Sequence, residues 1–191
     1  GISSGSKVLS YLGSLGGWYL TDEMLDFFAL MRKKIPGVVF LLITHDNKQQ
    51  ILAKVSAKGI PAEAILIKPA SRDEVPLFLS LSNWNLFFIK DAYSKKASSP
   101  TKQGEVMAMG IPVICNDIGD TGKIVQESKT GILVSRFGVE EYENVCRQLI
   151  SMPPADKEQI RRSACHYYDL KQGVQEYKKV YEKLFSKTGR K

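Results

Sequence analysis

Short apolar runs alternate along the chain with longer segments in which apolar residues recur at helical spacing. The short runs are typical of buried strands and cover residues 7–12, 38–43, 64–67, 85–89, 113–115 and 132–134. Helical spacing or helix-start residues mark residues 21–34, 46–58, 75–82, 99–110, 121–127, 139–150, 156–166 and 172–185. Strands separated by helices predict βαβ units and a doubly wound parallel sheet. The predicted fold class is therefore α/β, a Rossmann-like single domain with C-terminal helices.

The glycine-rich loop after the first predicted strand, GSLGGWYL, lies where such a sheet binds ligands. Ligands of doubly wound sheets bind beyond the carboxyl ends of the strands. Gly13, Gly16 and Gly17 allow a close approach of the backbone to a ligand, but the same glycines also suit a plain turn. Their spacing is not the dinucleotide-binding fingerprint. After this loop, Thr21 is expected to cap the first helix.

The segment SSPTKQGEVMAMGIPVICND, residues 98–117, predicts a helix whose first turn holds an anion. Ser99 is expected to cap this helix, Pro100 suits its first position, and Gly110 ends it. Lys102 then falls in the first turn, where the helix dipole disfavours a cation by up to about 1 kcal/mol. A phosphate at the free N–H groups would compensate that charge, because helix N-termini and lysines both bind phosphate.

Glu105 shares a helix face with Lys102, three residues earlier. Its carboxylate can accept two hydrogen bonds from a vicinal diol such as that of a ribose. Phosphate and diol together indicate a nucleotide. The structural alternative is an exposed glutamate paired with Lys102, worth about 0.3 kcal/mol.

The runs SPTKQGEVMAMGIPVICNDIGDTGKIV, KTGILV and YLGSLGGWYLTDEMLDFF support a resemblance to a known family. Together they resemble the C-terminal half of retaining glycosyltransferases built from two Rossmann-like domains, the GT-B type, among which mannosyltransferases are common. The resemblance covers residues 7–185. It implies that residues 7–191 form a nucleotide-sugar-binding domain and that an N-terminal acceptor domain is missing. Residues 1–6 are expected to be a linker or an expression remnant.

By this resemblance, Glu105 would bind the ribose, Lys102 the diphosphate, and the segment after the third strand the nucleobase. The implied nucleotide-sugar-binding residues are Lys102, Glu105, Gly13, Ser14, Gly16, Gly17, Ile67, Lys68, Pro69 and Thr101. No catalytic residue is assigned. The nucleotide sugar is the substrate, no cofactor is implied, and no essential metal is expected. The acceptor would be a glycan or a lipid-linked glycan, and polysaccharide biosynthesis is the implied setting.

Several positions depart from the family pattern. Ala97 stands where a second glutamate often contacts the transferred sugar, and Ser14 stands where many members have arginine. Gly122 and Lys123 replace a Pro-Glu pair. These departures leave two hypotheses open: a sugar-transferring enzyme, or a non-catalytic nucleotide-binding module of the same fold.

Composition and charge add less specific information. The chain is 43% hydrophobic and 25% charged, as in soluble globular proteins, and no apolar run is long enough to span a membrane. The cysteines have neither metal-site nor disulfide spacing, which fits the cytoplasm. Residues 155–191 contain ten Lys or Arg against five Asp or Glu, within a net charge of +7. These helices present either a solvated face or a surface for anionic lipid at the inner side of the membrane. No nucleic-acid-binding motif accompanies the charge.

Overall fold

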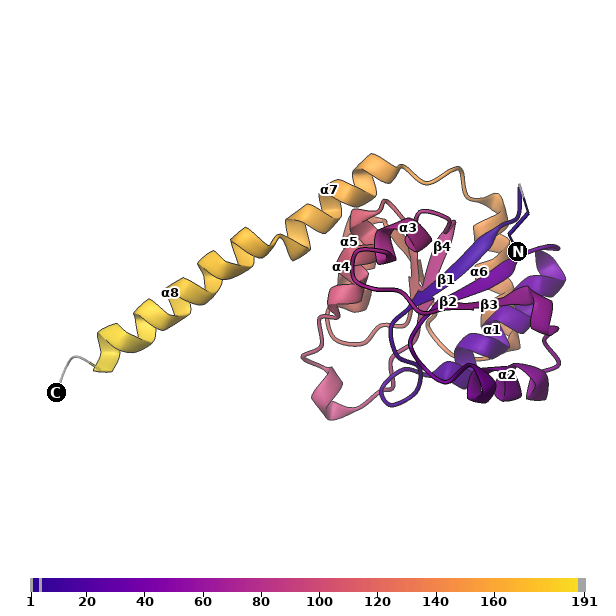
Figure 1. The fold of residues 1–191 in the computed structure, drawn as a ribbon. Coiled ribbons are helices and arrows are strands. Elements are labelled where there is room, and N and C mark those ends of the chain that lie inside the picture. The colour runs from indigo at the N-terminus through magenta and orange to yellow at the C-terminus, as the bar shows by residue number, and fades with distance from the viewer. Residues whose placement is uncertain (1, 4, 189–191) are drawn as a thin grey trace.

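A six-stranded parallel sheet forms the centre of the molecule in the computed structural model, which describes residues 2–3 and 5–188 (Figure 1). The strand order is β3-β2-β1-β4-β5-β6. The strands are β1 (Val8–Leu12), β2 (Val39–Ile43), β3 (Ile65–Lys68), β4 (Trp84–Phe87), β5 (Val113–Cys115) and β6 (Gly131–Leu133). The order reverses between β1 and β4, so the carboxyl ends of these two strands border the expected ligand site. The α/β doubly wound prediction is confirmed.

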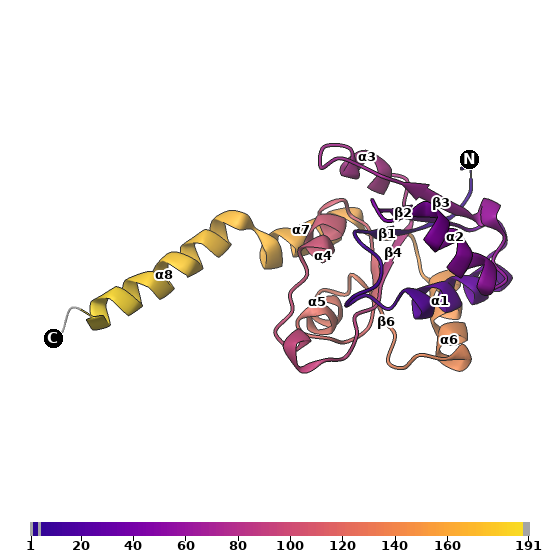
Figure 2. The same ribbon diagram turned by 60° about the horizontal axis from the view of Figure 1, so that its bottom comes forward.

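Helices cover both faces of this sheet. They are α1 (Thr21–Lys34), α2 (Lys48–Ala57), α3 (Val75–Leu79), α4 (Thr101–Ala108), α5 (Thr121–Ser128), α6 (Val139–Ser151), α7 (Lys157–Tyr168) and α8 (Leu170–Thr188). Short 3-10 turns, η1 (Ala62–Ala64) and η2 (Tyr93–Lys95), precede β3 and follow β4. Figures 1 and 2 show α1 and α6 on one face and α4, α5 and α7 on the other.

The core lies on both sides of the central strands. Every residue of β1 is buried because β2 and β4 flank it and helices cover both its faces. On the α1 side, Phe27 packs edge-to-face on Phe88 and Tyr142, with ring centroids 6.2 and 5.4 Å apart. This aromatic group ties α1 and α6 to the end of β4, and it fixes the loop that leaves β4 toward the site.

Two predicted helix caps are wrong. Ser99 does not cap α4, because Pro100 occupies the N-cap position and the helix begins at Thr101 without a side-chain cap. Thr21 is the first residue of α1 and not its cap, because its hydroxyl instead accepts a hydrogen bond from the Gly16 N–H at 2.9 Å. The Thr21 hydroxyl therefore binds the glycine loop and does not cap α1.

Element boundaries differ from the predictions at several ends. The strand predicted at residues 85–89 ends at Phe87, because Ile89 forms an isolated antiparallel bridge with Tyr19. The helix predicted at residues 75–82 is the short α3, and the last two helices are each longer than predicted. Parts of the predicted linker (residues 1 and 4) and of the predicted domain end (189–191) lie outside the described residues.

The two C-terminal helices, α7 and α8, differ in how they pack on the domain. α7 packs against α4, whereas α8 projects away from the body of the molecule (Figures 1 and 2). The side chains of α8 that the structure describes are all exposed. None of the described helices combines the length and apolar character needed to cross a membrane.

Candidate functional site

A lysine lies in an aromatic cage at the switch point of the sheet. Lys102, in the first turn of α4, places its Nζ 4.3 Å from the ring centroid of Tyr11 and 3.5 Å from that of Tyr19. The ammonium also donates a hydrogen bond to the Tyr11 hydroxyl at 3.2 Å. Lys102 makes no ion pair with any residue that the structure describes.

Burial changes the charge of this lysine. It lowers the pKa of Lys102 to about 7, and the carboxylate of Glu105 only partly opposes that effect. The neighbouring Tyr11 stays neutral, because burial raises the pKa of its hydroxyl. The ring faces of Tyr11 and Tyr19 stabilise a cation, but they do not neutralise it. The site thus holds a desolvated amine that is charged mainly below about pH 7 and has no ion-pair partner among the described residues.

The glycine loop wraps closely around Lys102. Gly13 has φ +110°, and a Cβ there would lie 3.0 Å from Lys102 Nζ. The Tyr11 hydroxyl donates to the Ser14 carbonyl oxygen, and the Asp46 carboxylate accepts from the Leu15 N–H. These contacts, together with the bond from Gly16 to Thr21, hold the loop in one conformation.

A cavity of about 110 Å³ opens beside this loop at the carboxyl ends of β1 and β2. Its lining residues are Leu12, Gly13, Ser14, Ile43, Thr44, His45, Ala70 and Val75. The His45 ring bonds the Ala70 carbonyl oxygen at 2.9 Å and so ties the loop after β3 to the cavity. Of the segment after β3, Ala70 lines the cavity. The expected nucleobase-binding residues Ile67, Lys68 and Pro69 do not line it.

The other expected site residues lie on the same edge of the sheet with different exposures. Glu105 is exposed one turn along α4 from Lys102, and Thr101 is exposed at the start of that helix. Ser14 and Gly17 are also exposed, and Gly16 is half-buried. The structure therefore gathers Gly13, Ser14 and Lys102 directly. It leaves Glu105 facing solvent.

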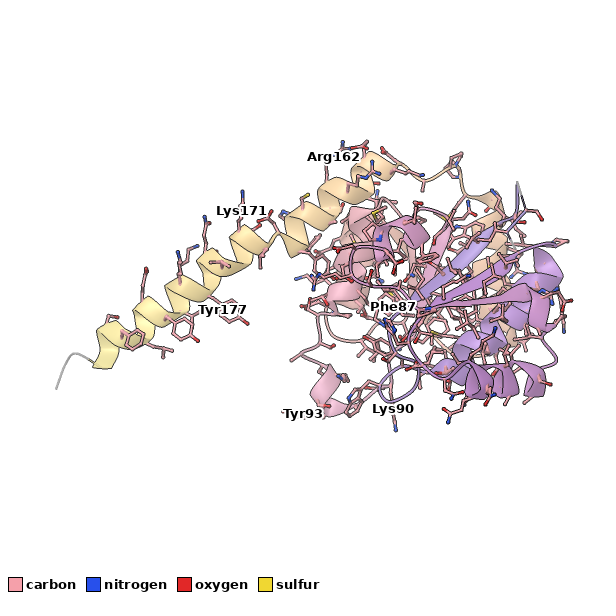
Figure 3. All side chains as sticks on the ribbon, viewed as in Figure 1. Phe87, Lys90, Tyr93, Arg162, Lys171 and Tyr177 are labelled. Atoms are coloured by element: carbon pink, nitrogen blue, oxygen red, sulfur yellow. The ribbon has the colours of Figure 1, made fainter. Side chains whose placement is uncertain are left out.

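Aromatic and basic side chains form a rim next to the cage. The Trp18 ring lies 4.6 Å from Lys95 Nζ, and its carbonyl oxygen accepts from the Lys90 N–H at 2.8 Å. Figure 3 shows Lys90 and Tyr93 at this end of the molecule. Ala97 lies exposed in the same loop, which runs on into α4.

A larger open depression, about 370 Å³, lies between α5 and α7 at the opposite edge of the sheet. It is lined by Glu127, Ser128, Lys129, Gln159, Arg162, Ser163, His166 and Tyr167. It lies away from the carboxyl ends of β1 and β4, where the strand order reverses and doubly wound sheets bind ligands. The smaller cavity beside the glycine loop is therefore the better candidate site.

Sequence reasoning noted that Tyr19, beside the glycine loop, could close over a ligand, but it missed Tyr11 and Asp46. Both look ordinary in the sequence, since Tyr11 belongs to an apolar strand and Asp46 begins a predicted helix. The lysine in the first turn of a helix was the one signal that an aromatic or anionic partner was needed nearby.

Comparison with known proteins identifies the family. The family model "Glycosyl transferases group 1" matches residues 1–165. The chain belongs to this family. The matched region contains the sheet, the glycine loop and α4, and it ends within α7, so α8 lies outside it. No curated protein shares significant sequence similarity with the chain.

Solved structures of glycosyltransferases share this fold. WaaG, a glycosyltransferase involved in lipopolysaccharide biosynthesis, matches with a TM-score of 0.69 and 16% identity over 88% of this chain and 44% of WaaG. TarM matches with a TM-score of 0.74 and 14% identity over 92% of this chain and 35% of TarM.

The C-terminal domain of the group 1 protein LpcC from Francisella tularensis matches with a TM-score of 0.58 and 21% identity. That match covers 86% of this chain and 83% of the LpcC domain. The chain spans less than half the length of WaaG, and its fold matches that of the LpcC C-terminal domain over most of both chains.

Proposed function

We propose that this group 1 domain binds the nucleotide-diphosphate sugar donor of a glycosyltransferase. The observation that carries the proposal is Lys102, a desolvated amine at the switch point of the sheet that lies against Gly13 and pairs with no carboxylate that the structure describes. A diphosphate would supply the negative charge that favours the protonated form of this amine. A mutant TarM from S. aureus, which shares this fold, has been crystallised with UDP.

The remaining parts of the donor would lie beside Lys102. The diphosphate would lie between the glycine loop and the first turn of α4, a helix that begins without a side-chain cap. The nucleobase would enter the 110 Å³ cavity, near Ala70, and Glu105 would accept hydrogen bonds from the ribose. During transfer, Lys102 would stabilise the charge that develops on the leaving diphosphate.

We further propose, from the resemblance alone, that transfer proceeds with retention and that the sugar is a hexose such as mannose. The acceptor, a glycan or lipid-linked glycan, would be held by an N-terminal domain, so the isolated domain would be inactive. The alternative is a nucleotide-binding module without transfer activity, and Ala97 and Ser14 motivate it. Assay of donor hydrolysis and sugar transfer by the full-length protein separates the two hypotheses.

Calorimetric titration with UDP, GDP and ADP tests the donor site. Lys102→Met is expected to abolish binding, and Glu105→Gln is expected to weaken it about tenfold, through loss of a charged hydrogen bond. Lys33→Met serves as the control. It removes an exposed lysine in the last turn of α1, at the end of that helix away from the glycine loop. Lys102→Met should raise the melting temperature, because it removes a buried charge. No binding by the wild type, or equal binding by wild type and Lys102→Met, would overturn the assignment.

A second proposal concerns α8, which we infer contacts an anionic membrane surface. Leu170, Val174, Tyr177 and Tyr181 are 79, 45, 71 and 57% exposed, and their spacing puts them on one helix face. Lys171 and Lys178 border this stripe, as in helices that lie on anionic bilayers. Lys171 and Tyr177 are labelled on the projecting helix in Figure 3. Such contact would place the protein at the cytoplasmic side of the membrane.

Vesicle co-sedimentation tests the lipid contact. Vesicles of phosphatidylcholine with phosphatidylglycerol are expected to bind the protein, and added salt or Lys171→Glu with Lys178→Glu should release it. Lys33→Glu is the control. Equal binding to pure phosphatidylcholine, or a concentration-dependent dimer that buries α8 in place of vesicle binding, would contradict the proposal.

A further inference from the structure

Gly104, in the middle of α4, leaves room for a ring from another helix. A Cβ at this position would lie 2.5 Å from Cγ of Tyr168 and 2.8 Å from its Cβ. The backbone of Gly104 is ordinary helix, so no unusual φ requires glycine here. Glycine inside a helix costs about 1 kcal/mol relative to alanine. Glycine at this position compensates for that cost because it lets the Tyr168 ring pack against the helix.

The contact falls at the part of α4 that carries the site. Gly104 lies between Lys102 and Glu105, and Tyr168 is the last residue of α7. Figures 1 and 2 both show α7 running alongside α4. The Tyr168 ring thus packs on the first turns of α4. It contacts the helix face opposite the one from which Lys102 reaches the rings of Tyr11 and Tyr19.

The first turn of α4 has little local support of its own. Its N-cap residue, Pro100, offers no side-chain hydrogen bond to the helix N–H groups. An uncapped first turn frays readily. Its supports come from other segments: the Asp120 N–H, which donates to the Ser98 carbonyl oxygen in the preceding loop, the Thr121 carbonyl oxygen, which accepts from the buried Gln103 side chain at 3.3 Å, and the Tyr168 ring on Gly104.

The ring and not the hydroxyl of Tyr168 makes this contact. The hydroxyl is buried near Ser99 and makes no hydrogen bond of ordinary geometry with any residue that the structure describes. The adjacent Tyr167 points elsewhere, since its hydroxyl donates to the Glu127 carboxylate on α5 at 3.0 Å. Tyr167 is therefore a matched control, with the same side chain one position away and no contact with Gly104.

We propose that Tyr168 is a positioning residue of the donor site, whose ring on Gly104 holds the first turn of α4 so that Lys102 stays in the cage of Tyr11 and Tyr19. This inference rests on the proposed donor-binding function. It assigns to α7 a role at the site that neither the family model nor the lysine cage itself indicates.

A set of single and double variants tests the contact. Tyr168→Ala is expected to weaken binding of UDP or GDP at least tenfold, whereas Tyr168→Phe and Tyr167→Ala stay within twofold of the wild type. Gly104→Ala is expected to weaken binding similarly, because its Cβ displaces the ring. Adding Gly104→Ala to Tyr168→Ala should cause no further loss, since the ring is gone, and this non-additivity identifies the pair.

A second readout works without nucleotide. NMR of the lysine ε-methylene groups in the ligand-free protein follows the titration of Lys102, which is expected near pH 7 in the wild type and in Tyr167→Ala, and near the ordinary lysine range in Tyr168→Ala. A melting temperature that falls in Tyr168→Ala while this titration and the affinity stay unchanged would overturn the inference. If no variant binds nucleotide but the titration still moves with Tyr168, the positioning role holds and the donor-binding proposal fails.

Discussion

At the scale of single residues, Lys102 is stabilised poorly by the protein alone. Between about pH 7 and the ordinary lysine pKa, the unfolded chain binds the proton and the folded protein does not. Stability therefore rises with pH across that window and is lowest below it. A buried amine that lowers the free energy of unfolding at neutral pH is typical of a functional site. Here that loss of stability is consistent with a site that binds an anion.

The lowered pKa of Lys102 predicts a pH-dependent affinity. Nucleoside diphosphates bind the protonated amine, so the affinity of the wild type should fall as pH rises above about 7, by at most about tenfold per pH unit. Lys102→Arg keeps its charge throughout this range and should lose the slope. Calorimetry at pH 6.5, 7.5 and 8.5 measures both proteins. Parallel pH profiles for the two would contradict the assignment of the titrating group.

At the scale of elements, the loop before α4 is fixed by the loop before α5. Gly119 has φ +62°, and a Cβ there would lie 2.1 Å from the Ser98 carbonyl oxygen. That same oxygen accepts a hydrogen bond from the Asp120 N–H at 3.0 Å. Close backbone contact thus positions the start of α4, and only glycine permits it.

Opposite effects are predicted for two glycine-to-alanine changes. Gly119→Ala should destabilise the protein by about 2 kcal/mol or more, because the methyl group overlaps the Ser98 carbonyl oxygen and the backbone becomes strained. Gly173→Ala, in the exposed α8 where nothing lies near the added Cβ, should be neutral or strengthen the helix by up to about 1 kcal/mol. Chemical unfolding measures both. A tolerated Gly119→Ala would show that the loop contact is not rigid.

At the scale of the whole molecule, a packed domain carries one helix that shares none of its core. Among the described residues, the buried apolar ones run from β1 to α7, and α8 contributes none of them. A helix outside a core depends on its own propensity, and isolated helices shorter than about 12–15 residues are marginal in water. α8 has 19 residues, only a little more than that, and they include Gly173. The stability of α8 is therefore expected to be separate from that of the domain.

Hydrogen exchange followed by mass spectrometry checks this separation. Amides of α8 should exchange at least about a hundredfold faster than those of α1 and β1, since local opening of α8 exposes no core. Vesicles containing phosphatidylglycerol should slow exchange in α8 alone. Protection of α8 equal to that of α1 in the protein by itself would contradict the expectation.

The sequence predicted the order of strands and helices because apolar periodicity is a local property. The strand at Val113–Cys115 was predicted to the residue, and the parallel sheet followed from the alternation of elements. Helix caps were less predictable. Thr21 and Ser99 have good capping side chains, but loop contacts decide where α1 and α4 begin.

For the candidate site too, the sequence predicted some features and only the structure revealed others. The sequence by itself determined that Lys102 lies in a first helical turn after a polar loop, and that a group was needed to stabilise its charge. Only the tertiary structure decided that Tyr11, 91 residues away along the chain, and Tyr19 surround that amine. It also decided that Tyr168 fills the space above Gly104. Such contacts arise when the sheet brings distant segments to one edge, and no periodicity in the sequence encodes which side chains meet there.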